Sequence, residues 1–352
     1  MKFIKATQLK DKPDATKLKF GQLFTDYMLE MNYENGQWGE PVISPYHDLV
    51  LAPESMILHY GQGIFEGAKA FRNDEGKIIL FRLMDNLKRL NLSAERMCMP
   101  QMDTDKVMGY ILELIDIERD WVPSSPETSL YLRPTMIATE KAVGVHASNS
   151  YKFFVILSPV GPYINGFNNP AKIYVEDTYT RAAVGGTGEA KCVGNYAGSI
   201  LAAHKAKAKG YNEVLWLDAK DRQYIEEVGA MNVMFVVDGE IITPTLTGSI
   251  LRGITRDSII KMMRDIGYTV REERININDL IKWYDEGRVT EMFGCGTAAV
   301  VSPVGTLTYK DKVCVFNNGK SGPVARVAFD RLDDIRKLRV PDKYGWITVL
   351  GK

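Results

Sequence analysis

Apolar residues recur along the chain at two spacings, one typical of helices and one typical of strands. Over residues 83–97 and 107–115 they return every three or four positions, which predicts two amphipathic helices. Over residues 130–136 they alternate with polar residues, as in a strand with one buried face. The other face of this strand carries a phenol, a guanidinium and a hydroxyl, from Tyr131, Arg133 and Thr135.

The second half of the chain mixes the same two patterns. Short apolar runs predict strands at 172–176, 213–217 and 289–293. An alanine-rich stretch over 196–209, followed by a glycine, predicts a helix. The dipeptide Asp238-Gly239 between two apolar runs is typical of a hairpin turn. We therefore predict an α/β chain of the mixed α+β type, with largely antiparallel sheets.

A segment rich in turn-forming residues divides the chain. Residues 158–170 hold three prolines, two glycines and three asparagines, which is typical of an ordered loop or linker. A length of 352 residues favours two domains. We predict a smaller N-terminal domain over 1–160, an interdomain loop over 161–171 and a larger C-terminal domain over 172–352.

Charge and composition exclude several classes of function. The 44 basic and 44 acidic side chains balance, so the chain lacks the basic excess of a nucleic-acid binder. No apolar run reaches the roughly 18 residues of a membrane span, and the N-terminus lacks a signal-peptide core. The four cysteines form no Cys-x-x-Cys pair, and the four histidines form no metal-type pair. We expect a soluble cytoplasmic protein with no metal.

Two glycine-rich turns invite a phosphate-binding interpretation. Residues 185–191 fail the Walker A pattern, because Ala190 and Cys192 stand where glycine and a hydroxyl residue are needed. Residues 294–299 match Gly-x-Gly-x-x-Ala, but a β-branched run follows instead of the helix that a dinucleotide requires. The helix start at Thr255 and the turn at Thr297 could each hold a single phosphate. Each could equally be a helix cap or a tight turn.

A lysine just after such a turn is usually solvated, but the segment around Lys191 is distinctive. Residues 185–197, Gly-Gly-Thr-Gly-Glu-Ala-Lys-Cys-Val-Gly-Asn-Tyr-Ala, resemble the lysine segment of the branched-chain amino acid aminotransferases, which are fold-type IV pyridoxal phosphate enzymes. Further matching positions follow the family's order over nearly the whole chain: 59–60, 65–67, 80–82, Asn86, Arg89, 132–134, 215–218, 226–232, 253–256, 286–289 and 293–298. The resemblance implies the two-domain fold of this group, similar to that of D-amino acid aminotransferase.

The resemblance also implies how the cofactor, pyridoxal 5'-phosphate, is held. Lys191 would form the internal Schiff base and then shuttle a proton, so that the C-terminal domain carries the catalytic lysine. Glu227 would bond the pyridine nitrogen, and its neighbour Glu226 would face the opposite side if both lie on a strand. Tyr196 would bond the phenolic oxygen. The phosphate would be bound by Arg89, Ile254, Thr255 and Thr297, although Arg89 could instead form a salt bridge on its helix.

For the substrate, the resemblance implies a carboxylate clamp and an apolar pocket. The clamp would consist of Tyr60 and Arg133 with the backbone at Ala298. The candidates for an aromatic wall are Phe20, Phe65, Tyr131 and Tyr163, each of which could instead be a core residue. Some family members carry a Cys-x-x-Cys after the Gly-Thr-Ala turn. This chain has Ala299 and Ser302 at those two positions, so thiol-based redox control is not expected. Ala230 replaces a threonine found in animal members.

The implied activity is reversible ping-pong transfer of the amino group between L-leucine, L-isoleucine or L-valine and 2-oxoglutarate. The implied assembly is a homodimer, with the site between two domains and near the partner. Two alternatives within fold-type IV are D-amino acid transamination and aminodeoxychorismate lysis. A more distant alternative is a non-catalytic phosphate-binding module that uses the same glycine turns without Lys191 chemistry.

Overall fold

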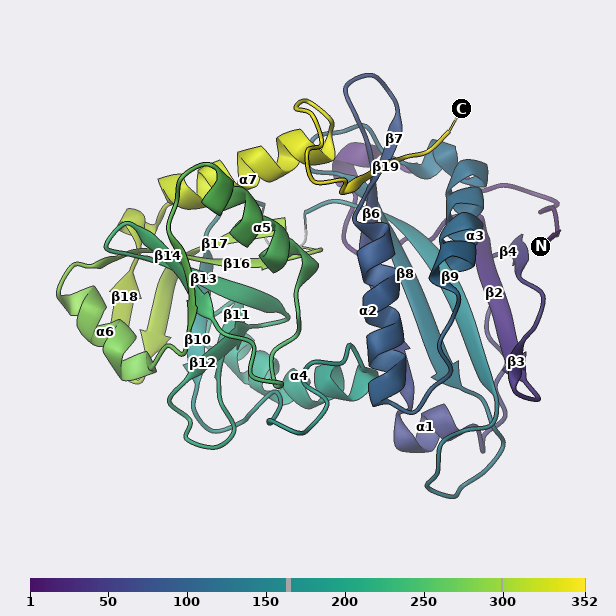
Figure 1. Cartoon of the computed structure of the whole chain (residues 1–352), viewed down its shortest axis with the longest axis horizontal. Coiled ribbons are helices and arrows are strands. Elements are labelled where there is room, and N and C mark those ends of the chain that lie inside the picture. Colours follow the sequence, from purple (N-terminus) through teal and green to yellow (C-terminus); the bar gives the residue numbers. More distant parts are fainter. Residues whose placement is uncertain (163–165, 299, 352) are drawn as a thin grey trace. The chain divides into compact units, whose positions relative to one another are not determined.

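The computed structural model describes residues 1–162, 166–298 and 300–351 of the chain (Figure 1). The chain forms two compact units. The first comprises Met1–Pro162, Ala190–Val193 and Ile335–Lys352, and the second comprises Tyr163–Glu189 and Gly194–Asp334. Both combine helices with a large sheet, which confirms the predicted mixed α/β class. In the described part of the chain, no helix is long and apolar enough to cross a membrane.

The first unit is built on one sheet with the strand order β1-β4-β2-β9-β8-β6-β7-β19, with β3 beside β2 and β5 beside β8. Every pairing is antiparallel except β1 with β4. Its strands are β1 (Lys2–Phe3), β2 (Tyr27–Glu34), β3 (Gln37–Trp38), β4 (Val42–Pro45), β5 (Gly63–Phe65), β6 (Ala68–Arg72), β7 (Ile78–Phe81), β8 (Ser129–Ala138), β9 (Tyr151–Val160) and β19 (Ile347–Val349).

Helices α2 (Leu83–Arg96) and α3 (Thr104–Ile117) pack on this sheet and on each other, while the short α1 (Met56–Tyr60) lies before β5 (Figure 1). Both longer helices lie where the apolar spacing predicts them. Leu83, Leu87 and Leu90 are buried on one side of α2, in the same core as the inner face of β8. Asp103 caps α3 by accepting a hydrogen bond from the Lys106 N–H.

The second unit has the strand order β12-β11-β10-β17-β16-β13-β14-β15, with β18 beside β17. Because β12 also pairs with β13, the strands from β12 to β13 close into a ring. Most pairings are antiparallel, whereas β10 with β11, β10 with β17 and β14 with β15 are parallel. The strands are β10 (Ala171–Glu176), β11 (Glu213–Leu217), β12 (Ile225–Val228), β13 (Met231–Val237), β14 (Glu240–Pro244), β15 (Val270–Glu273), β16 (Val289–Gly296), β17 (Val300–Tyr309) and β18 (Lys312–Val315).

The helices of this half of the chain are α4 (Val193–Ala208), α5 (Ile254–Asp265), α6 (Ile277–Asp285) and α7 (Pro323–Arg336). The expected helix over 196–209 is α4, which begins three residues earlier. The hairpin expected at Asp238-Gly239 joins β13 to β14, and both residues have positive φ as such a turn requires.

Two short segments belong to the first unit although they follow the second unit's residues in sequence. Segment Ala190–Val193, which contains Lys191, attaches to β5 through a bridge between Cys192 and Ile64. The C-terminal strand β19 pairs with β7. These are contacts between distant residues, which local patterns do not encode. The lysine expected in the C-terminal domain therefore lies with the N-terminal unit.

Candidate active site

Lys191 is held by its backbone against the first unit's sheet. Its N–H donates to Ser93 Oγ (2.9 Å), and its carbonyl accepts from the Phe65 N–H (3.0 Å). The half-buried side chain places Nζ 4.8 Å from the centroid of the Phe65 ring, where the ring face attracts the cation. Two backbone anchors and one aromatic contact thus fix the direction of the amine.

The residue after Phe65 forms a buried ion pair with α2. Glu66 is fully buried, and its carboxylate accepts from Arg89 Nε (2.6 Å) and Nη2 (2.9 Å) and from Asn86 Nδ2 (2.9 Å). Burial opposes ionisation of Glu66, but the Arg89 guanidinium, with Lys191 and Asn86 assisting, holds its pKa below the usual range. Arg89 thus forms a buried salt bridge with a residue outside its own helix.

A cation and aromatic rings gather beside this pair. The Arg133 guanidinium carbon lies 4.6 Å from the Phe65 ring centroid and 5.3 Å from that of Tyr131. Arg133 Nη2 also donates to the Tyr131 hydroxyl (3.2 Å), and the Phe20 ring meets Tyr131 edge to face at 5.0 Å. Arg133 Nε is buried and has no hydrogen-bond partner among the described residues. Phe20, Phe65 and Tyr131 thus form one wall, with Arg133 and Lys191 both on the Phe65 ring.

Gly67 is required by the close approach of Tyr131. A Cβ at this position would lie 2.1 Å from the Tyr131 hydroxyl, a distance at which two atoms overlap. The three residues Phe65-Glu66-Gly67 thus contribute, in order, a ring for two cations, a carboxylate for Arg89 and space for a phenol.

Two other candidate substrate residues lie apart from these contacts. Tyr60 lies at the end of α1 and is 38% exposed, and Tyr163 lies outside the described residues.

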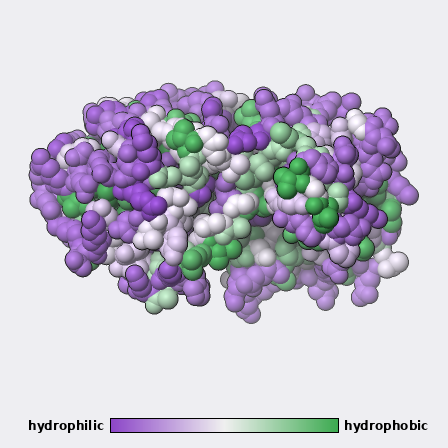
Figure 2. Space-filling view, turned by 90° about the horizontal axis from the view of Figure 1, so that it is seen from below, coloured by the Kyte–Doolittle hydropathy of each residue, from purple (hydrophilic) through white to green (hydrophobic). Residues whose placement is uncertain are grey.

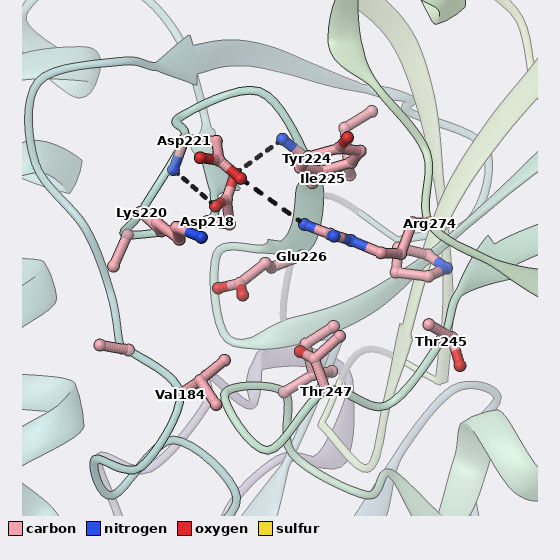
Figure 3. A pocket seen from close by; sticks show the side chains of 14 residues that line it. Val184, Asp218, Lys220, Asp221, Tyr224, Ile225, Glu226, Thr245, Thr247 and Arg274 are labelled. Atoms are coloured by element: carbon pink, nitrogen blue, oxygen red, sulfur yellow. Dashed lines mark hydrogen bonds and ion pairs between the residues drawn. The ribbon is translucent and has the colours of Figure 1, made fainter.

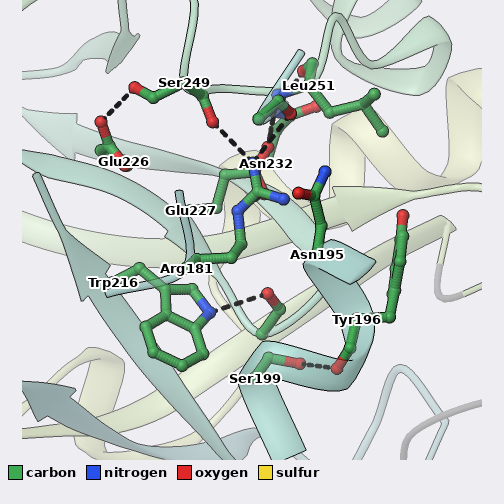
Figure 4. Close-up of polar contacts among 12 residues, drawn as sticks. Arg181, Asn195, Tyr196, Ser199, Trp216, Glu226, Glu227, Asn232, Ser249 and Leu251 are labelled. Atoms are coloured by element: carbon green, nitrogen blue, oxygen red, sulfur yellow. Dashed lines mark hydrogen bonds and ion pairs between the residues drawn. The ribbon is translucent and has the colours of Figure 1, made fainter. Parts of the chain in front are cut away.

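The second unit holds a second cluster, centred on Glu227 of β12 (Figure 4). Glu227 is 3% exposed, and Arg181 Nε lies 2.8 Å from its Oε2. Its Oε1 accepts from the Leu251 N–H (2.8 Å) and from Asn232 Nδ2 (3.3 Å). Arg181 Nη2 also bonds the carbonyls of Gly188 (3.1 Å) and Ser249 (2.7 Å). The carboxylate is thus fixed by a counter-charge and by two hydrogen bonds.

Glu226 is turned away from this network, as the alternation of side chains along a strand requires (Figure 4). Its Oε1 accepts a hydrogen bond from the Ser249 hydroxyl, and its pKa is raised by burial.

Tyr196 lies in the first turn of α4, beside Asn195 (Figure 4). Asn195 exchanges two hydrogen bonds of 2.7 Å with Thr187, which ties the glycine-rich turn to this helix.

The two candidate phosphate loops belong to the same unit. Helix α5 begins at Ile254 after Gly253, an N-cap residue with no side chain that could bond the first-turn amides. Gly253 packs so closely that a Cβ there would lie 1.9 Å from Asn232 Oδ1. On β13, Asn232 pairs with Glu227 on one side and with Cys295 on the other. Thr297 and Ala298 follow directly after β16, two and three residues beyond Cys295.

The structure brings some of the expected site residues together and not others. In the first unit, contacts join Lys191, Arg133, Phe65, Tyr131 and Phe20, and Arg89 is bonded to Glu66. In the second unit, Glu227 has its own cluster, while Tyr196, Ile254, Thr255, Thr297 and Ala298 lie in the same unit but outside the contacts described for it.

Sequence reasoning gave no role to Glu66 and Asn232, although both lie in the segments that carry the family resemblance. It missed Arg181 and Ser249 entirely. These two lie outside every matching segment, and only the fold brings them to Glu227 and Glu226.

Comparisons with known proteins show which family the chain is similar to. The amino-transferase class IV family model matches residues 63–307. The branched-chain-amino-acid transaminase 1 of Bacillus subtilis (strain 168) is 49% identical over 344 residues, which cover 97% of each chain. A crystal structure of the Escherichia coli branched-chain amino acid aminotransferase has a TM-score of 0.77 at 28% identity, covering 93% of this chain and 99% of that one. The T.th. branched-chain amino acid aminotransferase complexed with N-(5'-phosphopyridoxyl)-L-glutamate has a TM-score of 0.74 at 28% identity, covering 91% and 98%.

Proposed function

Because this chain belongs to the class IV aminotransferases, we propose that it transfers the amino group reversibly between L-leucine, L-isoleucine or L-valine and 2-oxoglutarate, with pyridoxal 5'-phosphate as cofactor. The observation that carries this proposal is the placement of Lys191 Nζ and the Arg133 guanidinium on one ring, that of Phe65, at 4.8 and 4.6 Å. The amine of Lys191, which could form the Schiff base, thus lies on the same ring as the Arg133 guanidinium, which could bind a carboxylate. These are the two partners that an α-amino acid needs.

Residues on the chain fit the three functional groups of the cofactor. Lys191 would hold the aldehyde carbon covalently through Nζ. Glu227 would accept a hydrogen bond from the pyridine nitrogen, with its own charge balanced by Arg181. The first-turn amides of α5 at Ile254 and Thr255 would face the phosphate, since the helix N-terminus favours an anion and Gly253 provides no capping side chain.

Three further residues complete the proposed set. Tyr196 would donate its hydroxyl to the phenolic oxygen of the cofactor ring. Thr297 would add a hydroxyl at the phosphate. Arg89 would serve the phosphate and Glu66 together, which a guanidinium with five N–H donors permits.

When bound, pyridoxal phosphate supplies an aldehyde that exchanges with amines and a ring that withdraws electrons from the substrate Cα. The chain's own residues would do the rest. Lys191 Nζ, once released, would remove the proton from Cα and return it on the adjacent carbon. Arg133 would bind a substrate carboxylate through its buried Nε, and Tyr60 and the Ala298 backbone would assist. Phe20, Phe65 and Tyr131 would enclose the branched side chain and exclude water.

A substrate panel on the purified, cofactor-loaded protein tests this assignment. We expect rapid transfer from L-leucine, L-isoleucine and L-valine to 2-oxoglutarate and a far slower reaction with D-alanine. Efficient transfer from D-alanine, or pyruvate release from aminodeoxychorismate without transfer from L-leucine, would assign the chain to another activity of the same class. Full activity of Lys191→Ala would refute the role of the lysine.

We also propose a homodimer located in the cytoplasm. Figure 2 shows small groups of apolar side chains on one face of the molecule. The exposed apolar residues of the chain include Ile200 (65%) on α4 and Val143 (69%) and Val145 (86%) between β8 and β9. Such side chains suit burial against a second copy. The four cysteines are free thiols, as in a reducing compartment. Light scattering measures the mass of the assembly, and cell fractionation tests the location.

A further inference from the structure

A cavity of about 580 Å³ lies in the second unit (Figure 3). Its wall is formed by the turn 218–221, by β12, by the loop 244–250 and by residues 183–184 and Arg274. Glu226 lines this cavity, whereas Glu227 does not. The two residues are neighbours on β12 and face opposite ways. The cavity is therefore distinct from the proposed cofactor cluster, and its volume is within the range of small-molecule sites.

The Glu226 carboxyl is buried and only half satisfied. The residue is 4% exposed, and Ser249 bonds its Oε1. Its Oε2 is buried and has no hydrogen-bond partner in the part of the chain that the structure describes. Buried polar atoms in proteins almost always form a hydrogen bond. An unbonded carboxylate oxygen on a cavity wall therefore indicates a ligand with a hydrogen-bond donor.

The other charges of the cavity are arranged around this carboxyl. Asp218 is occupied by the turn itself, because it accepts backbone N–H groups from residues 221, 223 and 224 at 2.8–3.0 Å. Arg274 stacks on the Tyr224 ring (3.6 Å) and lies 4.0 Å from Asp221. The exposed Lys220 forms no ion pair with any described residue. The acidic Glu226 and the cationic Lys220 thus remain, and both are labelled in Figure 3. The apolar residues Val184 and Ile250 also line the cavity.

We propose that this cavity is a second binding site, which takes an amino acid with an apolar side chain. The ligand's ammonium donates to Glu226 Oε2, its carboxylate pairs with Lys220, and its side chain packs on Val184 and Ile250. The arrangement excludes a simple anion, because the innermost group is a carboxyl, and it excludes an apolar compound, because that would leave Oε2 without a donor. The site does not depend on the proposed catalytic function, because neither Lys191 nor Glu227 lines the cavity. The two clusters are linked only indirectly, since Ser249 bonds Glu226 through its hydroxyl and Arg181 through its carbonyl.

The site is also positioned to affect the cofactor cluster. Burial raises the pKa of Glu226, the Arg181 charge acts in the opposite direction, and the Glu227 charge raises this pKa further. An ammonium bound at Glu226 adds a positive charge next to these two groups. Occupancy of the cavity should therefore alter the electrostatic potential at Glu227.

Equilibrium dialysis with radiolabelled L-leucine tests the proposal. The protein is first loaded with pyridoxal phosphate and treated with borohydride, which would reduce the C=N bond between cofactor and lysine and so prevent amine exchange there. We expect about one L-leucine bound per chain. Glu226→Gln keeps the shape but presents an amide that cannot neutralise an ammonium. Val184→Trp fills the cavity from a position that is 72% exposed, so folding should be retained. Each should weaken binding at least tenfold.

Arg133→Gln, in the other unit, is the matched control and should leave this binding unchanged. Either of two results would overturn the proposal: no binding to the treated protein, or binding that survives both cavity variants. Binding that Arg133→Gln weakens as strongly as the cavity variants do would place the ligand at the catalytic cluster and would equally overturn it. A lack of transaminase activity, by contrast, would leave the dialysis result intact.

Discussion

Replacing Arg89 by methionine should destabilise the first unit strongly, because it leaves a carboxylate in the core without its counter-charge. Glu66 is fully buried and meets the guanidinium at 2.6 and 2.9 Å. Removing one partner of a buried ion pair typically costs about 3–5 kcal/mol. For a unit of about 150–250 residues, each kcal/mol corresponds to about 2–4 °C. The Tm of the cofactor-free Arg89→Met protein should therefore fall by about 6–20 °C at pH 7.

The pH dependence of this loss has a definite sign. The pKa of Glu66 is depressed in the folded protein, so its ionisation stabilises the fold above the unfolded value near 4.5. That contribution is lost as the pH falls through the folded pKa. The difference in the free energy of unfolding between wild type and Arg89→Met should therefore be largest near neutral pH and should narrow below pH 4.5, measured by urea unfolding.

A double variant separates the structural role of Arg89 from its proposed role at the phosphate. Glu66→Gln/Arg89→Met removes both charges, and it should recover most of the stability that the single variant loses. Its affinity for pyridoxal phosphate should remain weak, because the guanidinium is still missing. The reasoning is refuted if Arg89→Met loses less than about 1 kcal/mol, or if the double variant is no more stable than the single one.

Three further predictions follow from single contacts. Burial raises the pKa of Glu118 to about 7, so stability should fall as the pH rises through 7, and Glu118→Gln should flatten this dependence in thermal unfolding. Arg181→Met removes the counter-charge of Glu227 and should lower kcat/KM about 10–150-fold, since a hydrogen bond to a charged group contributes about 1.5–3 kcal/mol. In contrast, Arg252→Met, which removes an exposed pair with Glu189, should change kcat/KM less than twofold; equal effects would contradict the assigned role. Gly67→Ala should displace the Tyr131 hydroxyl and raise the KM for L-leucine, and an unchanged KM would contradict the close contact.

Local patterns were sufficient to predict several elements. Apolar spacing predicted α2 because Leu83, Leu87 and Leu90 must share one face to reach the core. Alternation along β8 predicted that Tyr131 and Arg133 share a face, and their side chains are indeed bonded to each other. Each of these predictions depends only on the period of a helix or a strand.

Long-range contacts were not predictable in the same way. Nothing near Arg181 in sequence indicates that it meets Glu227, which is 46 residues further along the chain. Lys191 was expected in the C-terminal domain because of its sequence position, yet its backbone is bonded to Ser93 and Phe65. The family resemblance supplied the identity of Glu227 and Lys191, and the structure supplied the residues that hold them in place.

The most direct test of the account is to identify the lysine that carries the cofactor. The holoenzyme is reduced with borohydride, digested, and mapped by mass spectrometry. Lys69 is the alternative lysine that could carry the cofactor. It is buried on β6, and burial lowers its pKa to about 7, which makes its amine reactive. We predict that the reduced phosphopyridoxyl group is found on the peptide containing Lys191 and that Lys191→Ala loses it. A label on Lys69, or on no lysine, would contradict the account.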